Sequence, residues 1–103
     1  MKLNVDYEIG GYKFEWDSEK ADKNYKKHNI LFKVAARAFC DPNKIDDYDE
    51  LHSDDEDRFK MIGKVGKILV VIYTERGDKH RIISARLANK KERDDYYEQF
   101  AYL

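Results

Sequence analysis

The sequence predicts a small α+β domain, in which two short N-terminal helices and one C-terminal helix pack on a mainly antiparallel sheet. Residues 68–72 (ILVVI) are too short a run for an independent helix and rich in β-branched side chains, as expected of a strand covered on both faces. Turn residues at 74–78 and a second strand at 81–86 complete a hairpin. Segments with helical spacing precede and follow this hairpin, and that order of elements is typical of an α+β fold.

The length of 103 residues predicts a single domain over 1–103, with room for one hydrophobic core. One cysteine excludes an internal disulfide and suits a reducing compartment. No apolar run approaches the roughly 20 residues that cross a bilayer, and the first four residues lead into charged positions rather than a secretory signal. We therefore expect a cytoplasmic protein without a membrane segment.

Residues 5–9 and 12–16 both alternate apolar and polar side chains, and Gly10-Gly11 lies between them. This pattern predicts an N-terminal β-hairpin. Asp17 or Ser18 can cap a helix that follows. The predicted apolar face of that helix is formed by Ala21, Tyr25 and His28.

Asn29 is a suitable C-terminal stop for the first helix. A second short helix should present an apolar stripe and end before Pro42. The stripe consists of Phe32, Ala35, Ala36 and Phe39.

The acidic segment 43–57 should be mostly irregular, with a short edge strand near Ile45, and 58–64 should form a strand. Asn89 and Glu92 have the spacing of a capping box, which predicts a terminal helix. Its apolar stripe consists of Tyr96, Phe100 and Leu103.

The charges are segregated along the chain. Residues 1–57 hold 9 Lys or Arg and 15 Asp or Glu, whereas residues 58–103 hold 11 and 6, so the two parts carry net charges of −6 and +5. A basic C-terminal part favours a polyanionic ligand such as nucleic acid. The alternative is that the segregated charges are simply solvated.

Three blocks of sequence resemble the BrnT family of toxins from bacterial type II toxin–antitoxin systems. They are FEWDSEKADKNYKKH (14–28), FCDP (39–42) and VVIYTERGDKHRIISAR with the downstream KKER (70–93). The resemblance covers about residues 14–97, so residues 1–13 extend beyond the usual family start. It implies a RelE-like fold, a ribonuclease activity that arrests translation, and a BrnA-like antitoxin, expected to be a ribbon–helix–helix protein. DNA would then be contacted only through the antitoxin.

Metal-free RNA cleavage needs cations at the phosphate, a group that accepts the ribose 2′-OH proton and a group that protonates the leaving oxygen. Arginine suits the first task, because its planar fork matches two phosphate oxygens. Arginines of adjacent predicted elements are the phosphate-binding candidates: Arg58, Arg76, Arg81 and Arg86. Alternatively, some of them bridge surface carboxylates. No metal or other cofactor is expected, since the three histidines and one cysteine lack zinc-site spacing.

Proton transfer is assigned to Glu75 or Tyr73. We expect His80, beside a turn, to be solvated, and His52, in the acidic segment, to have no role. Additional RNA-binding candidates are Lys60, His28, Lys90 and Lys91.

The sequence hypothesis is therefore a toxin that cleaves RNA by 2′-OH attack without metal and inhibits translation. Its substrate would be RNA, either free or bound to the ribosome. The alternative is a non-catalytic RNA-binding or antitoxin-binding module that acts mainly in a repressor complex.

Overall fold

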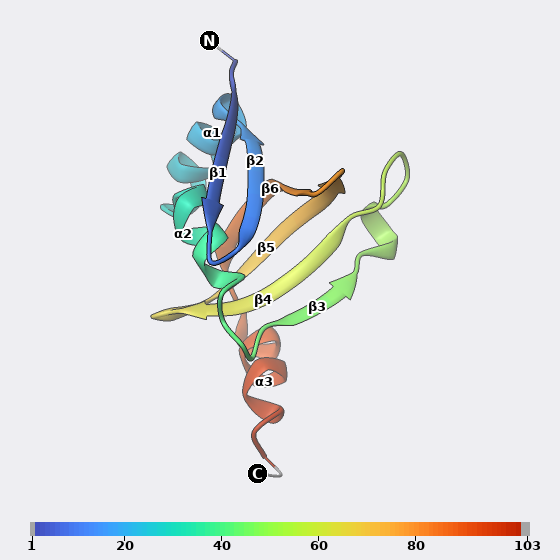
Figure 1. Ribbon diagram of the computed structural model, residues 1–103. Helices are drawn as coiled ribbons and strands as arrows, with labels where there is room; N and C mark the ends of the chain where they lie inside the picture. Colours follow the sequence, from blue (N-terminus) through green and yellow to red (C-terminus); the bar gives the residue numbers. More distant parts are fainter. Residues whose placement is uncertain (1, 102–103) are drawn as a thin grey trace.

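The computed structural model describes residues 2–101 and contains one six-stranded sheet with the order β1-β2-β6-β5-β4-β3 (Figure 1). The strands are β1 (Asn4–Ile9), β2 (Tyr12–Asp17), β3 (Ile45–Tyr48), β4 (Phe59–Val65), β5 (Lys67–Arg76) and β6 (Lys79–Leu87). The helices are α1 (Ser18–His28), α2 (Phe32–Ala38), the short 3-10 helix η1 (Glu50–His52) and α3 (Lys90–Glu98). The α+β class predicted from the sequence is thus confirmed; the RelE-like assignment stays a prediction.

The sheet is mixed, which refines the prediction of a mainly antiparallel sheet. β2 pairs with β6 in parallel, with Phe14 opposite His80 and Glu15 opposite Arg81. The other strand pairs within residues 2–101 are antiparallel. The parallel pair arises because α1 and α2 carry the chain away from β2, and β6 returns beside it much later in the sequence.

The two faces of the sheet are covered by different helices. α1 and α2 pack on the face that carries Phe14, Met61 and Val71, whereas α3 packs on the opposite face against Ile62 and Val70. Figure 1 shows α1 and α2 together beside the N-terminal hairpin, with α3 at another end of the molecule. We call these the α1–α2 face and the α3 face. None of the helices in residues 2–101 has the length and apolar character needed to span a bilayer.

The N-terminal hairpin turns at Gly10 and Gly11, whose φ angles of 59° and 82° lie in the region that favours glycine. α1 begins at Asp17, whose carboxylate accepts the Glu19 N–H at 2.8 Å, and it ends at Asn29 in the left-handed conformation (φ 58°). Of the two predicted N-terminal caps, Asp17 is the one used, and the predicted stop at Asn29 is correct.

The predicted apolar face of α1 is correct only in part, since Ala21 packs against the core. Tyr25 is 41% exposed, and the buried residue of the helix is Asn24. The Asn24 side chain accepts the Ala85 N–H at 3.1 Å and donates to the carbonyls of Ala85 at 3.0 Å and Ile30 at 3.3 Å. β2 pairs with β6 only at His80 and Arg81, so the β6 edge near Ala85 obtains its hydrogen bonds from Asn24 instead.

α2 buries the predicted stripe of Phe32, Ala35, Ala36 and Phe39. It approaches β4 so closely that a Cβ atom at Gly63 would lie 2.7 Å from the Ala38 carbonyl oxygen. Glycine is therefore required at this contact.

α3 has the predicted capping box between Asn89 and Glu92. Tyr96 is buried, and its hydroxyl donates to Asp41 at 2.6 Å, which ties α3 to the segment after α2. Phe100 follows the helix and packs beside Tyr96, whereas the predicted contribution of Leu103 lies outside the described residues.

We expect Asn24→Ala to lower the free energy of unfolding by roughly 2–5 kcal/mol, because the buried N–H and C=O of Ala85 lose their partner. Urea denaturation measures this change, and Lys23→Ala, at an exposed site on the same helix, should alter stability by less than about 0.5 kcal/mol. Equal effects of the two substitutions would contradict the role given to Asn24.

Candidate active site

A groove on the α3 face contains the positively charged side chains of Arg58, Lys60 and Arg86. Its volume is about 420 Å³, and Ile72 and Ile83 contribute apolar lining. The strand register explains the convergence: Lys60 lies opposite Ile72 on β5, and Ile72 in turn lies opposite Ser84 on β6, one side-chain repeat from Arg86.

A β-bulge places the two β6 arginines on the same face of the sheet. Residues 81 and 86 are five apart, and in a regular strand their side chains would point to opposite faces. The register with β5 shifts between Ile72, which pairs with Ser84, and Tyr73, which pairs with Ile82, so Ile83 is the extra residue. Arg81 and Arg86 consequently both lie on the α3 face.

Glu92 binds the two cations of the groove that lie on strands, Lys60 of β4 and Arg86 of β6. Its carboxylate accepts two hydrogen bonds from Arg86, at 2.7 and 2.8 Å, and lies 2.5 Å from the Lys60 ammonium nitrogen. The same carboxylate accepts the Asn89 N–H at 2.9 Å. Hydrogen bonding to Arg86 and Asn89, together with Lys60, lowers the pKa of the buried Glu92 to about 2. Two cations share one carboxylate, so positive charge remains for a ligand.

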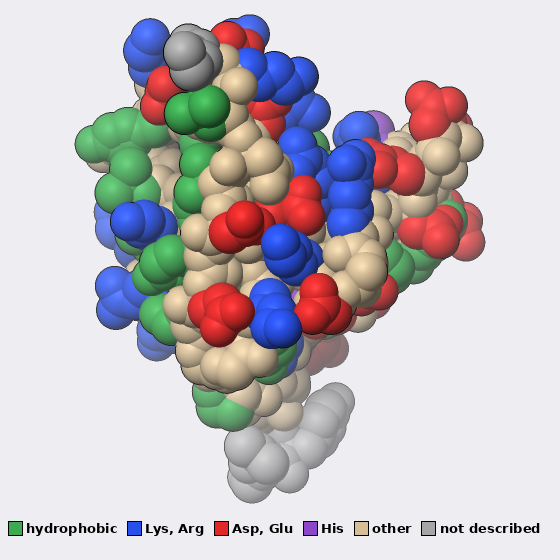
Figure 2. Space-filling model, turned by 45° about the horizontal axis from the view of Figure 1, so that its top comes forward, with side chains coloured by type: hydrophobic (Ala, Val, Ile, Leu, Met, Phe, Trp, Pro, Cys, Tyr) green, Lys and Arg blue, Asp and Glu red, His purple; other side chains and the backbone are tan. Residues whose placement is uncertain are grey.

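The loop after β3 forms the rim of the groove with Asp49, Leu51 and His52. His52 was expected to have no role, yet its side chain lines the groove beside Arg58. Figure 2 shows acidic side chains gathered on a projecting lobe, which corresponds to this loop, with Lys and Arg side chains nearby.

The other two predicted arginines lie on the α3 face but outside the lining of the groove. Arg76 pairs with Glu56 at 3.4 Å. Arg81 forms an ion pair with Glu15 and donates to the Asn4 side chain at 2.8 Å. Both arginines therefore fit the alternative interpretation of the sequence, in which an arginine binds a surface carboxylate, and Arg81 also binds an amide.

Tyr73 and Glu75 lie on the opposite, α1–α2 face of β5, because they alternate with Ile72 and Thr74. The Tyr73 hydroxyl donates to Asp46 at 2.8 Å, and its burial, together with this bond, raises the pKa of the hydroxyl. The sheet thus separates both side chains from a phosphate held by Arg58 and Arg86. For this reason we do not assign proton transfer in the groove to them.

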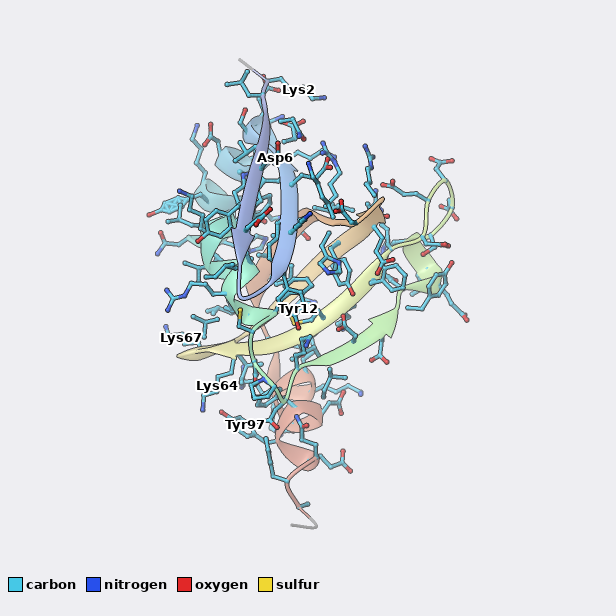
Figure 3. The ribbon with its side chains drawn as sticks, in the orientation of Figure 1. Lys2, Asp6, Tyr12, Lys64, Lys67 and Tyr97 are labelled. Atoms are coloured by element: carbon cyan, nitrogen blue, oxygen red, sulfur yellow. The ribbon has the colours of Figure 1, made fainter. Side chains whose placement is uncertain are left out.

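His80 is half-buried rather than solvated, which corrects the expectation from its position beside a turn. Its ring lies among Tyr12, Phe14, Phe39 and Tyr73, at centroid distances of 5.1–6.0 Å. Tyr12 lies beside the turn of the N-terminal hairpin, at the start of β2 (Figure 3). Burial lowers the pKa of His80, although the nearby carboxylates oppose this effect. The parallel pairing of β2 with β6 creates this environment, and no local pattern signals it.

The remaining predicted RNA-binding residues are dispersed. His28 ends α1 on the α1–α2 face. Lys90 and Lys91 are exposed on α3 and pair with Asp94 and Asp95, at 2.8 and 3.2 Å. Within residues 2–101, no group of three or more His, Cys, Asp or Glu side chains is arranged to hold a metal ion.

Comparisons with known proteins identify the relatives of this chain. Residues 16–92 match a family described as the ribonuclease toxin, BrnT, of type II toxin–antitoxin systems. The chain belongs to the BrnT family. Among solved structures, it is similar to the 1.1 Å crystal structure of the Brucella abortus ribonuclease toxin BrnT. The sequence identity is 25% and the TM-score 0.56, over 73% of this chain and 94% of that chain. A comparison with curated protein sequences finds no match.

The segment that matches the BrnT family includes every cation of the groove and ends at Glu92. β1 and most of β2 lie outside the match, so the hairpin partners of Arg81 and Lys79 include residues that the family model does not cover. The family likeness proposed from the sequence is thus confirmed.

We expect Glu92→Gln to destabilise the protein at pH 7 by on the order of 2–3 kcal/mol, because the native pKa of about 2 lies well below the ordinary 4.5. The glutamine amide oxygen can still accept the Asn89 N–H. This contribution is complete above about pH 4.5 and is lost as the pH falls toward 2, so the two proteins should converge in acid.

Urea denaturation at pH 7 and pH 3 measures the difference. Asp94→Asn is the matched control, since its partner Lys90 is solvent-exposed and such pairs contribute little. A pH-independent difference between wild type and Glu92→Gln would show that the charge of Glu92 is not what stabilises the fold.

Proposed function

We propose that this BrnT-family protein is a metal-independent endoribonuclease that uses the groove of Arg58, Lys60 and Arg86 to bind the scissile phosphate. The observation that carries the proposal is that these three cations line one concavity and lie within the segment matched to the family. A phosphate between them would accept charge-assisted hydrogen bonds from two guanidinium groups and one ammonium group.

The chemistry would be an attack of the ribose 2′-oxygen on the adjacent phosphorus. The 2′-O–P bond forms, the P–O5′ bond breaks, and the products are a 2′,3′-cyclic phosphate and a 5′-hydroxyl end. Negative charge builds on the phosphorane oxygens in the transition state, where preorganised cations are most effective. Glu92 would supply that preorganisation, since it fixes Arg86 and Lys60 before RNA binds.

The apolar lining suits a base or ribose next to the bound phosphate. Ile72 and Ile83 lie between the cations of β4 and β6, and Ser84 adds a hydroxyl that can donate to RNA. The groove thus offers both charge and a surface for one nucleotide.

Membership of a type II toxin–antitoxin family implies an antitoxin partner. We propose that this partner is a BrnA-like protein of the ribbon–helix–helix class, that DNA is contacted only through it, and that RNA cleavage by the free toxin inhibits translation.

Arg58→Ala should lower the rate of RNA cleavage by about 100-fold or more, because one of the cations at the developing charge is lost. The distance of 4.0 Å between Arg58 and Glu56 indicates a weak pair, so the fold should tolerate the change. Arg37→Ala, an exposed arginine on α2, is the matched control. Single-turnover cleavage of an end-labelled RNA measures both, and equal rates would exclude the groove as the site.

An RNA with a single 2′-deoxy substitution at the cleaved nucleotide should bind but remain intact, because the nucleophile is missing. Gel analysis of the products, with and without EDTA, tests the hydroxyl and the independence from metal together. Cleavage of the deoxy substrate would contradict attack by the 2′-oxygen.

A second candidate function is non-catalytic binding of RNA or antitoxin in a repressor complex. It is favoured by the acidic loop beside the groove and by the carboxylate partners that Arg58, Lys60 and Arg86 already have. RNA binding that weakens steeply with salt, without any cleavage, would support this function.

A further inference from the structure

His52 lies at the rim of the groove with a carboxylate bound to one ring nitrogen. Its Nδ1 is 2.9 and 3.1 Å from the two carboxylate oxygens of Asp49. The His52 side chain is 65% exposed, whereas that of Asp49 is 15% exposed. Because the Asp49 carboxylate only accepts hydrogen bonds when it is ionised, it selects the tautomer with the proton on Nδ1 and leaves the Nε2 lone pair for a ligand.

The turn that carries His52 is fixed to the start of β4. The Asp49 N–H donates to the Arg58 carbonyl at 2.8 Å. The Ser53 hydroxyl donates to the Asp49 carbonyl at 2.5 Å and accepts the Arg58 N–H at 3.0 Å. These bonds tie the backbone on both sides of His52 to the residue that brings a guanidinium group into the groove. The imidazole and Arg58 are therefore held on one scaffold.

Charged groups of three elements share the grooves that His52 lines. The loop itself contributes Asp49, Asp54, Asp55 and Glu56, β4 with the residue before it contributes Lys60 and Arg58, and β6 contributes Arg86. No carboxylate or hydroxyl of β5 or β6 other than Ser84 lines this groove. Glu75 and Tyr73 lie across the sheet, so within residues 2–101 His52 provides the imidazole that lines the groove.

We propose that His52 is the general base of this site and that Asp49 is its positioning residue. The inference rests on the proposed ribonuclease function. Nε2 of His52 takes the proton of the 2′-hydroxyl as the 2′-oxygen bonds to phosphorus, and Asp49 stabilises the imidazolium that results. The P–O5′ bond breaks, the 5′-oxygen takes a proton from water, and His52 then returns its proton to the solvent.

The test compares His52→Asn, Asp49→Asn and wild type with the same RNA. His52→Asn should lower the cleavage rate about 100- to 1,000-fold and leave binding of the 2′-deoxy RNA unchanged within about twofold. The wild-type rate should fall with unit slope in acid, because a general base must be unprotonated to accept the proton. That acidic limb should be absent from His52→Asn.

Asp49→Asn should reduce the rate about tenfold or more, because an amide no longer fixes the tautomer or stabilises the imidazolium. Glu50→Gln removes an exposed carboxylate from the same turn outside the groove and should cleave at the wild-type rate. Unfolding midpoints of all variants verify that the turn is intact.

Three results would overturn the inference. A His52→Asn variant that cleaves at the wild-type rate, with the same pH profile, would exclude the histidine while leaving the ribonuclease proposal in place. Wild-type protein that binds RNA and never cleaves it would remove both. A His52→Asn variant that loses RNA binding together with cleavage would instead assign the residue to substrate binding.

Discussion

One buried carboxylate joins the helix that covers the sheet to the cations that line the groove. Glu92 accepts hydrogen bonds from Arg86, contacts Lys60 and closes the capping box of α3 through Asn89. A buried ion pair is costly to desolvate, and it is stabilising only where the geometry satisfies every lone pair. Here, four partner contacts surround one side chain that is 5% exposed. The stability of α3 and the electrostatics of the groove are therefore set by the same residue.

The face of the sheet on which a polar side chain lies determines which other polar side chains it can contact. The α1–α2 face contains an aromatic cluster in which Phe39, Tyr73 and His80 contact one another. The Tyr73 hydroxyl donates to Asp46, whereas Nδ1 of His80 is buried without a hydrogen-bond partner among residues 2–101. The α3 face is apolar under the helix and charged beyond it. The groove lies on the part of the α3 face that the helix leaves uncovered.

Local signals predicted most of the fold. The caps at Asp17, Asn29 and Asn89 were read correctly because each depends on residues within one turn of it. The buried position of Asn24 was missed, since a polar residue is expected to be exposed until a strand edge that needs its amide is placed beside it.

The groove was predicted less completely than the fold. Arg58, Lys60 and Arg86 were selected because cations near a hairpin suit phosphate, and the structure brings these three together. The bulge at Ile83 cannot be inferred from side-chain alternation, and it determines on which face Arg81 lies. His52 is expected from the sequence to have no role, because its neighbours in sequence are acidic. In the structure, hydrogen bonds connect the turn that carries it to the backbone of Arg58.

The parallel pairing of β2 with β6 has a consequence for the order in which the groove forms during synthesis. β2 is synthesised long before β6. It can pair with β6 only after a further stretch of more than sixty residues has been made, as the pairing of Phe14 with His80 indicates. Arg86 and Glu92 emerge later still. A nascent chain that contains the loop and β4 therefore lacks an organised groove until Arg86 and Glu92 have also been made.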